Sequence, residues 1–170
     1  RFKVKGEDAY ILAWTTTPWT LPSNVALCVN PDEDYVKVTS KGYTYYMAAA
    51  LVDTVLGEGA EILEHYQGKD LEFKEYEPLF PYAEKRIGNK KAYYVVCDTY
   101  VTLTDGTGVV HIAPAFGEDD SKVGHRYDLP FVQLVNEKGE MTEETPWAGT
   151  FCKKADMAVL QALEDKDLLF

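Results

Sequence analysis

Three consecutive threonines, Thr15 to Thr17, stand in the segment AWTTTPWTLPSN at residues 13–24. A group of hydroxyls can donate and accept hydrogen bonds, and can hold a polar substrate and a water molecule in a fixed geometry. The plainer interpretation is that threonine favours β-strands and that its hydroxyl closes local turns around Pro18. This segment alone does not separate the two.

A second segment, DGTGVVHIAPAFGEDD at residues 105–120, combines one histidine with three acids. His111 lies in an alternating run, which predicts a strand with Val109 and His111 on the same face. The acids at 118–120 suit a polar site, but they also suit the first turn of a helix, where they face the positive end of its dipole. A lone histidine in a strand is more often structural than catalytic, so both interpretations stay open.

Several enzyme classes lack their signatures here. GTGVVH at residues 106–111 begins like a dinucleotide-binding loop, but histidine replaces the third glycine and a strand follows. The chain has no GxxxxGK phosphate loop, no GxSxG segment and no HExxH pair. Cys28, Cys97 and Cys152 are far apart and have no zinc-binding spacing. We therefore expect neither a metal nor a cofactor in this domain.

Composition limits the class of protein. The chain has 170 residues, of which 46% are hydrophobic, and we expect residues 1–170 to form a single domain with its own core. The net charge of −11 argues against a protein held mainly by phosphate contacts. The chain starts with neither an initiator methionine nor a signal peptide, which predicts a fragment of a longer protein, and its three widely spaced cysteines fit a reducing, cytoplasmic setting.

The elements that position these segments are mostly strands. Runs rich in β-branched and aromatic residues predict strands at 9–15, 25–29, 35–39, 43–47, 61–66, 92–97, 109–113 and 131–135. Helices are expected at 48–56, 119–127 and 155–163, the last with Ala158, Leu160 and Leu163 on one apolar side. The expected fold class is mainly β with peripheral helices (α+β), as a barrel or a sandwich.

Taken together, TTTPWTLPSN, YEPLFPY and GTGVVHIAPAFGEDD resemble, in order and spacing, the editing domain of the isoleucyl-tRNA synthetase family. The related valyl and leucyl editing domains usually carry Arg-Pro-Glu or Arg-Pro-Asp where this chain has Thr17-Pro18-Trp19, so Trp19 favours the isoleucyl branch. The resemblance implies a β-barrel with peripheral helices, inserted in a larger class I synthetase. The HxGH and KMSKS signatures of the synthetic site do not occur in this chain.

The resemblance also implies a catalytic set. Asp120 corresponds to the carboxylate that holds the substrate ammonium, and charge-assisted bonds of this kind are strong in a partly dry pocket. Thr15, Thr16 and Thr17 correspond to residues around the terminal adenosine, the ester and the attacking water. No general base can be identified from the residues.

The substrate-binding set follows in the same way. Trp19 and His111 correspond to residues that line the side-chain sieve, with His111 also near the terminal ribose, and Asn24 adds a polar contact. Glu118 and Asp119 are left to helix capping.

The activity implied is hydrolysis of valyl-tRNA specific for isoleucine, with the tRNA 3′ end and the parent catalytic domain as partners and a monomer as the expected state. ATP and magnesium would be used by the parent elsewhere. Two alternatives remain. One is a module that binds aminoacylated RNA ends or small amino acids without hydrolysis, and the other is a structural insertion whose editing has decayed.

Overall fold

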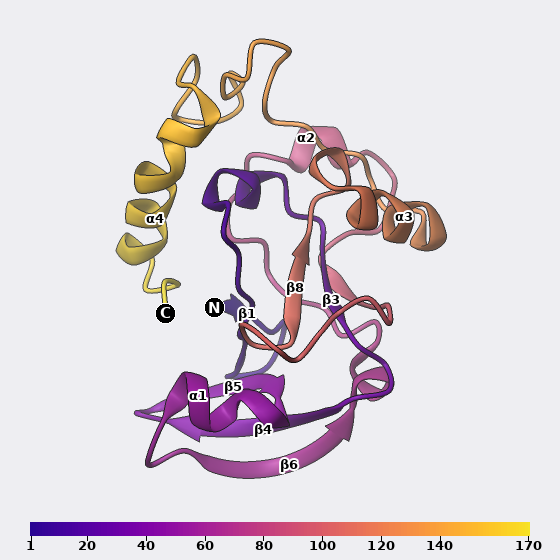
Figure 1. The fold of residues 1–170 in the computed structure, drawn as a ribbon. Coiled ribbons are helices and arrows are strands. Elements are labelled where there is room, and N and C mark those ends of the chain that lie inside the picture. Colours follow the sequence, from indigo (N-terminus) through magenta and orange to yellow (C-terminus); the bar gives the residue numbers. More distant parts are fainter. The chain divides into compact units, whose positions relative to one another are not determined.

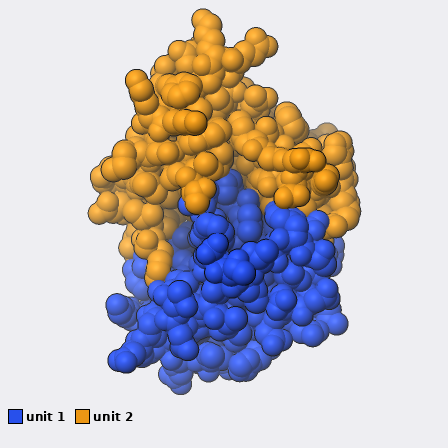
Figure 2. Space-filling model, viewed as in Figure 1, with its two compact units in different colours: residues 1–15, 26–77, 93–111 blue, residues 16–25, 78–92, 112–170 orange.

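The computed structural model describes all residues from Arg1 to Phe170. The chain forms two compact units, each assembled from three separate segments (Figure 2). Unit 1 contains Arg1–Thr15, Ala26–Glu77 and Tyr93–His111, and unit 2 contains Thr16–Val25, Pro78–Ala92 and Ile112–Phe170. No helix combines the length and the apolar character that crossing a membrane would require.

The larger sheet of unit 1 has five strands in the order β1-β2-β5-β4-β6 (Figure 1). The strands are β1 (Phe2–Lys3), β2 (Tyr10–Ile11), β4 (Asp34–Ser40), β5 (Tyr43–Ala48) and β6 (Glu61–Gln67). Strand β2 runs parallel to β5, whereas the other neighbouring pairs are antiparallel. Strand β6 pairs only with β4 and forms one edge of this sheet.

A tight hairpin joins β4 to β5. Ser40 lies opposite Tyr43, so the turn has two residues, and both have positive φ angles, 50° at Lys41 and 86° at Gly42. Such turns match the right-handed twist of the flanking strands. After β5 the chain forms a short 3₁₀ helix (Ala49–Leu51) and helix α1 (Val52–Leu56), which ends at Gly57.

The second sheet has three strands in the order β7-β3-β8. They are β3 (Ala26–Val29), β7 (Tyr94–Cys97) and β8 (Val109–Ile112), and only the last residue of β8 belongs to unit 2. The central strand β3 runs parallel to β7, and each of its four residues is at most 1% exposed. A strand buried on both faces reads as a continuous apolar run, which explains the sequence ALCV.

Unit 2 is built from short helices and loops. Its α-helices are α2 (Glu84–Ile87), α3 (Glu118–Tyr127) and α4 (Asp156–Asp165), and its 3₁₀ helices are Pro18–Ser23, Pro114–Phe116 and Cys152–Ala155. One core cluster contains Val135, Met141, Cys152 and Ala155.

Helix α4 lies next in sequence to this cluster and buries a different side from the one expected. Val159 and Leu163 are its buried residues, whereas Ala158 and Leu160 are half-buried. The sequence Ala155, Val159, Leu163 has a spacing of four residues, which a helix places on one face.

Most expected elements are present, but two expectations need correction. The β-barrel is not confirmed, because the strands form two separate sheets of mixed direction and no closed barrel. The strand expected at 131–135 is absent, and only an isolated bridge joins Val135 to Met141. The remaining 3₁₀ helix (Gly68–Leu71), helix α2 and strand β1 were not expected.

Candidate functional site

The threonine segment divides between the two units. Thr15 is half-buried in unit 1, and Thr16 and Thr17 are exposed in unit 2. Pro18 then starts a 3₁₀ helix, where a missing backbone N–H costs nothing. The buried hydroxyl of Thr20 donates to the carbonyl oxygen of Thr17 at 2.8 Å and thereby closes the first turn. Thr20 is therefore structural, and the exposed hydroxyls are those of Thr16 and Thr17.

Trp19 is half-buried within unit 2. Its ring meets that of Phe116 edge to face, with centroids 5.1 Å apart, and its backbone N–H donates to Oδ1 of Asp156 at 2.9 Å. The indole also packs against the cluster of Val135, Met141, Cys152 and Ala155. Trp19 is thus anchored from several directions, as a wall of rigid shape would require.

Asn24 follows the same 3₁₀ helix and is only 4% exposed. Its backbone N–H donates to the carbonyl oxygen of Leu21 at 3.0 Å, and that of Val25 donates to Ile112 at 3.0 Å. These bonds join the threonine-containing segment to the end of β8 inside unit 2. The predicted substrate contact of Asn24 stays a prediction.

Asp120 lies in the first turn of α3, four residues after Phe116. Its Oδ2 accepts a hydrogen bond from the backbone N–H of Ala113 at 2.9 Å. Burial raises the pKa of Asp120 above its usual range, and the hydrogen bond from Ala113 works in the opposite direction. The carboxylate is therefore held in one orientation directly after β8.

The acids beside Asp120 have lesser contacts. Gly117 is the N-cap of α3, so no side chain caps this helix in the usual way. Glu118 pairs weakly with Lys122 at 3.5 Å, one turn further along. All three acids lie in the first turn, as expected, but it is Asp120 that bonds to the backbone before the helix.

His111 belongs to unit 1 and is 7% exposed. Burial lowers the pKa of His111 to about 4, so the imidazole is neutral near pH 7. The preceding residue, Val110, forms a parallel bridge with Trp14, which precedes Thr15. Thr15 and His111 therefore lie on neighbouring segments of unit 1.

The structure thus groups the predicted residues within each unit. In unit 2, Trp19 contacts Phe116, and hydrogen bonds connect the end of the threonine-containing segment through β8 to Asp120. In unit 1, the Trp14 bridge connects Thr15 and His111. Sequence reasoning did not single out Phe116 or Trp14. The structure contains no group of three or more His, Cys, Asp or Glu side chains that could hold a metal ion.

The fold is that of aminoacyl-tRNA synthetase editing domains. A structure of GlLeuRS-CP1 superposes with a TM-score of 0.73 at 16% identity, covering 95% of this chain and 84% of that one. The P. knowlesi cytosolic leucyl-tRNA synthetase editing domain gives 0.70 at 15% identity, covering 94% and 83%. No protein-family model matches the chain.

The sequence comparison is more specific. Isoleucine–tRNA ligase from Clostridium acetobutylicum is 51% identical over the whole chain, and that from Clostridium novyi is 49% identical. The resemblance to the isoleucyl-tRNA synthetase editing domain is therefore confirmed. The chain spans 16% of the length of these relatives.

Proposed function

We propose that this chain hydrolyses valyl-tRNA specific for isoleucine, as a proofreading domain of an isoleucyl-tRNA synthetase. Support comes from the 51% identity along the whole chain, together with the editing-domain fold. Water attacks the carbonyl carbon of the ester, the bond to the ribose oxygen breaks, and the products are valine and a tRNA with a free ribose hydroxyl. The reaction needs no oxidant, metal or nucleotide.

A second site is useful because one methylene gives little discrimination. A pocket built for isoleucine rejects valine by only about 1–3 kcal/mol, a limit for which isoleucyl-tRNA synthetases are themselves the usual example. Hydrolysis of the smaller product at a separate site multiplies the selectivity. Such a site must bind an ammonium, confine a short branched side chain and deliver water to an ester.

The observation that carries the proposal is the fixed carboxylate of Asp120. Its Oδ2 is bonded to Ala113, so the group is oriented before a substrate arrives. We assign it to the substrate ammonium, because a preformed charged contact loses little entropy on binding. In its ionised form the single carboxylate can balance the one positive charge of the ammonium, and burial, which raises the pKa of Asp120, is offset in part by the hydrogen bond from Ala113.

The other residues supply shape and orientation. We assign Trp19 to the wall of the side-chain pocket, since Phe116 and the core cluster hold its ring in place. His111 is assigned to the same sieve, and its burial favours a neutral wall over a proton carrier. Thr15, Thr16 and Thr17 would position the ester and the attacking water, which is catalysis by orientation and by donors aimed at the developing oxyanion.

Deacylation assays test the proposal. The protein is mixed with valyl-tRNA and isoleucyl-tRNA, both on tRNA specific for isoleucine, and release of each amino acid is followed. We expect release of valine well above the spontaneous rate and little release of isoleucine. Tight binding of valyl-tRNA without turnover would instead identify a binding module. The tRNA 3′ end and a synthetase catalytic domain are the partners that this function implies.

A further inference from the structure

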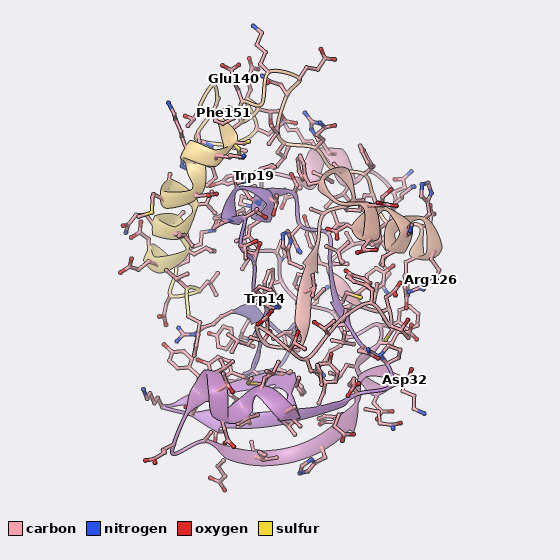
Figure 3. The ribbon with its side chains drawn as sticks, viewed as in Figure 1. Trp14, Trp19, Asp32, Arg126, Glu140 and Phe151 are labelled. Atoms are coloured by element: carbon pink, nitrogen blue, oxygen red, sulfur yellow. The ribbon has the colours of Figure 1, made fainter.

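Asp156 is the first residue of helix α4 and lies 137 positions after Trp19 in the sequence. Its Oδ1 accepts a hydrogen bond from the backbone N–H of Trp19 at 2.9 Å. Both residues belong to unit 2, and Trp19 lies beside the start of α4 (Figure 3). No sequence motif includes Asp156, and the proposed mechanism gives it no role. This half-buried carboxylate therefore contacts the backbone of a residue that we assign to substrate selection.

The short 3₁₀ helix that carries Trp19 has no acceptor of its own for the N–H of this residue. In a 3₁₀ helix each N–H donates to the carbonyl three residues before it, so the first donors have no partner inside the helix. Pro18 has no N–H, and that of Thr20 donates to the carbonyl oxygen of Thr17 at 3.0 Å. The side chain of Thr17, the N-cap residue, makes no capping hydrogen bond. Asp156 therefore supplies the cap from a distant segment.

The position of Asp156 in α4 favours this contact. The residue lies in the first turn of the helix, where the positive end of the helix dipole stabilises a negative charge. A hydrogen bond to a charged acceptor is also about twice as strong as one between neutral groups. The backbone of Trp19 is therefore held to α4 more firmly than an ordinary turn hydrogen bond would hold it.

The residues just before Asp156 hold the indole ring of the same tryptophan. Cys152 and Ala155, in the 3₁₀ helix that leads into α4, belong to the cluster against which Trp19 packs. Residues 152–156 thus fix Trp19 both at its ring and at its backbone. Apolar packing is not directional, so the hydrogen bond to Asp156 is the contact that sets the position of the Trp19 backbone.

We propose that Asp156 is a positioning residue of the side-chain pocket, which holds the indole of Trp19 at the distance that admits valine and excludes isoleucine. The inference rests on the proposed function, because it uses the assignment of Trp19 to the pocket wall. Asp156 then touches neither the substrate nor the attacking water and acts only through Trp19. A displacement of about 1 Å can change a rate by about 100-fold, and the two substrates differ by a single methylene.

Binding of stable substrate analogues tests this inference independently of hydrolysis. The probes are the amides of valine and of isoleucine with 3′-amino-3′-deoxyadenosine, in which nitrogen replaces the ester oxygen. We expect the wild-type protein to bind the valyl form at least about tenfold more tightly, the lower end of the usual effect of one methylene. In Asp156→Ala this preference should fall by at least about fivefold, because the wall is no longer held in place. Asp156→Asn keeps an acceptor oxygen and should retain most of the preference.

Amide hydrogen exchange at Trp19, followed by NMR, measures the contact itself. The N–H of Trp19 should be protected in the wild type and in Asp156→Asn, and it should exchange faster in Asp156→Ala. Asp165→Ala is the matched control, because it removes the same side chain from the same helix, where Oδ1 of Asp165 accepts from Gln161 at 2.9 Å. The control should change neither the exchange rate nor the preference, and thermal unfolding checks that each variant is folded.

A folded Asp156→Ala protein that keeps the wild-type preference would overturn the positioning role and leave the proposed function intact. Loss of the preference while Trp19 stays protected would also overturn it, because Asp156 would then act by another route. A wild-type protein that binds both analogues equally would reject the assignment of Trp19 to the pocket and the role of Asp156 with it. Absence of deacylation by a wild-type protein that shows the Asp156-dependent preference would instead reject hydrolysis alone.

Discussion

The carboxylate of Asp120 accepts a hydrogen bond from the backbone N–H of Ala113 at 2.9 Å, across the short 3₁₀ helix that joins β8 to α3. The residue assigned to the substrate ammonium therefore also closes the local chain. Its two roles can be separated because an amide keeps the acceptor oxygen and loses the charge.

Asp120→Asn should reduce deacylation of valyl-tRNA by at least tenfold while leaving stability nearly unchanged, since the amide oxygen still accepts from Ala113. Asp120→Ala should lose the activity and also about 0.5–1.5 kcal/mol of unfolding free energy, the usual net contribution of one hydrogen bond. Steady-state kinetics and urea unfolding measure the two effects. Asp119→Ala is the control and should retain activity. Wild-type rates in Asp120→Asn would refute the assignment.

His111→Ala should begin to hydrolyse isoleucyl-tRNA, because removing the buried ring makes room for one more methylene, whose burial contributes about 0.8 kcal/mol. Rates on both esters are compared for wild type and variant across pH 5–8. Burial lowers the pKa of His111 to about 4, so this residue should produce no change of rate near pH 6.5 in the wild type. Equal loss on both esters, with a transition near that pH, would indicate a general base instead.

The same burial predicts an effect on stability. A histidine whose folded pKa lies below its unfolded value near 6.5 binds protons more readily when the chain is unfolded. The free energy of unfolding should therefore fall as pH decreases from about 6.5 towards about 4, and change no further through this group below that. Urea unfolding at several pH values should reveal a smaller decrease in His111→Gln than in the wild type. An identical decrease in both proteins would contradict the burial of a neutral imidazole.

Glu7 should stabilise unit 1 at neutral pH. Burial opposes its ionisation, but hydrogen bonds from Lys37, Tyr46 and Lys74 prevail and lower the pKa of Glu7 to about 2. The contribution of Glu7 to the free energy of unfolding is complete above pH 4.5, the pKa of this group in the unfolded chain, and is lost as the pH falls towards 2. Glu7→Gln should cost about 1 kcal/mol at pH 7, because the group is partly exposed, and almost nothing at pH 2. Exposed Glu58→Gln serves as the control, and equal costs for the two variants would refute the role.

Gly68→Ala should destabilise the protein by about 1–3 kcal/mol, as is usual when a close contact is overpacked. The added Cβ would lie 1.9 Å from the backbone oxygen of Asn30, which cannot rotate away as a side chain would. Chemical denaturation measures the loss. Gly42→Ala, in the hairpin turn, has open space around it and tests the cost of positive φ alone. A Gly68→Ala protein as stable as the wild type would mean that the backbones of Gly68 and Asn30 are less closely packed than the structure shows.

The sequence predicts strands well where alternation and burial agree, as in β4 and β5. The segment 131–135 also alternates, with Val132 and Leu134 buried, yet it forms no strand. The backbone N–H of Leu134 donates to the hydroxyl of Ser23 at 3.2 Å, so a side chain takes the place of a ladder partner. The alternation of apolar and polar residues cannot reveal that a distant side chain will accept the hydrogen bond that a neighbouring strand would otherwise accept. Alternation also cannot decide whether a sheet closes, which is why a barrel was expected.

In the candidate site, too, residues that stand close together in sequence could be predicted, whereas contacts between distant residues could not. The threonine and acidic segments were recognisable because their residues stand close together in sequence. Trp14 was not, because its bridge partner Val110 lies far along the chain. Phe116 became visible only through its ring contact with Trp19.

The interleaving of the two units has a consequence for the history of this domain. The chain passes from one unit to the other after residues 15, 25, 77, 92 and 111, so no single stretch of the gene encodes either unit. A recombination event with a crossover inside residues 1–170 would therefore leave at least one unit with parts from two parents. The two units are expected to have been inherited together, and a homologous replacement should preserve the contacts inside each unit only when it exchanges the segments of both.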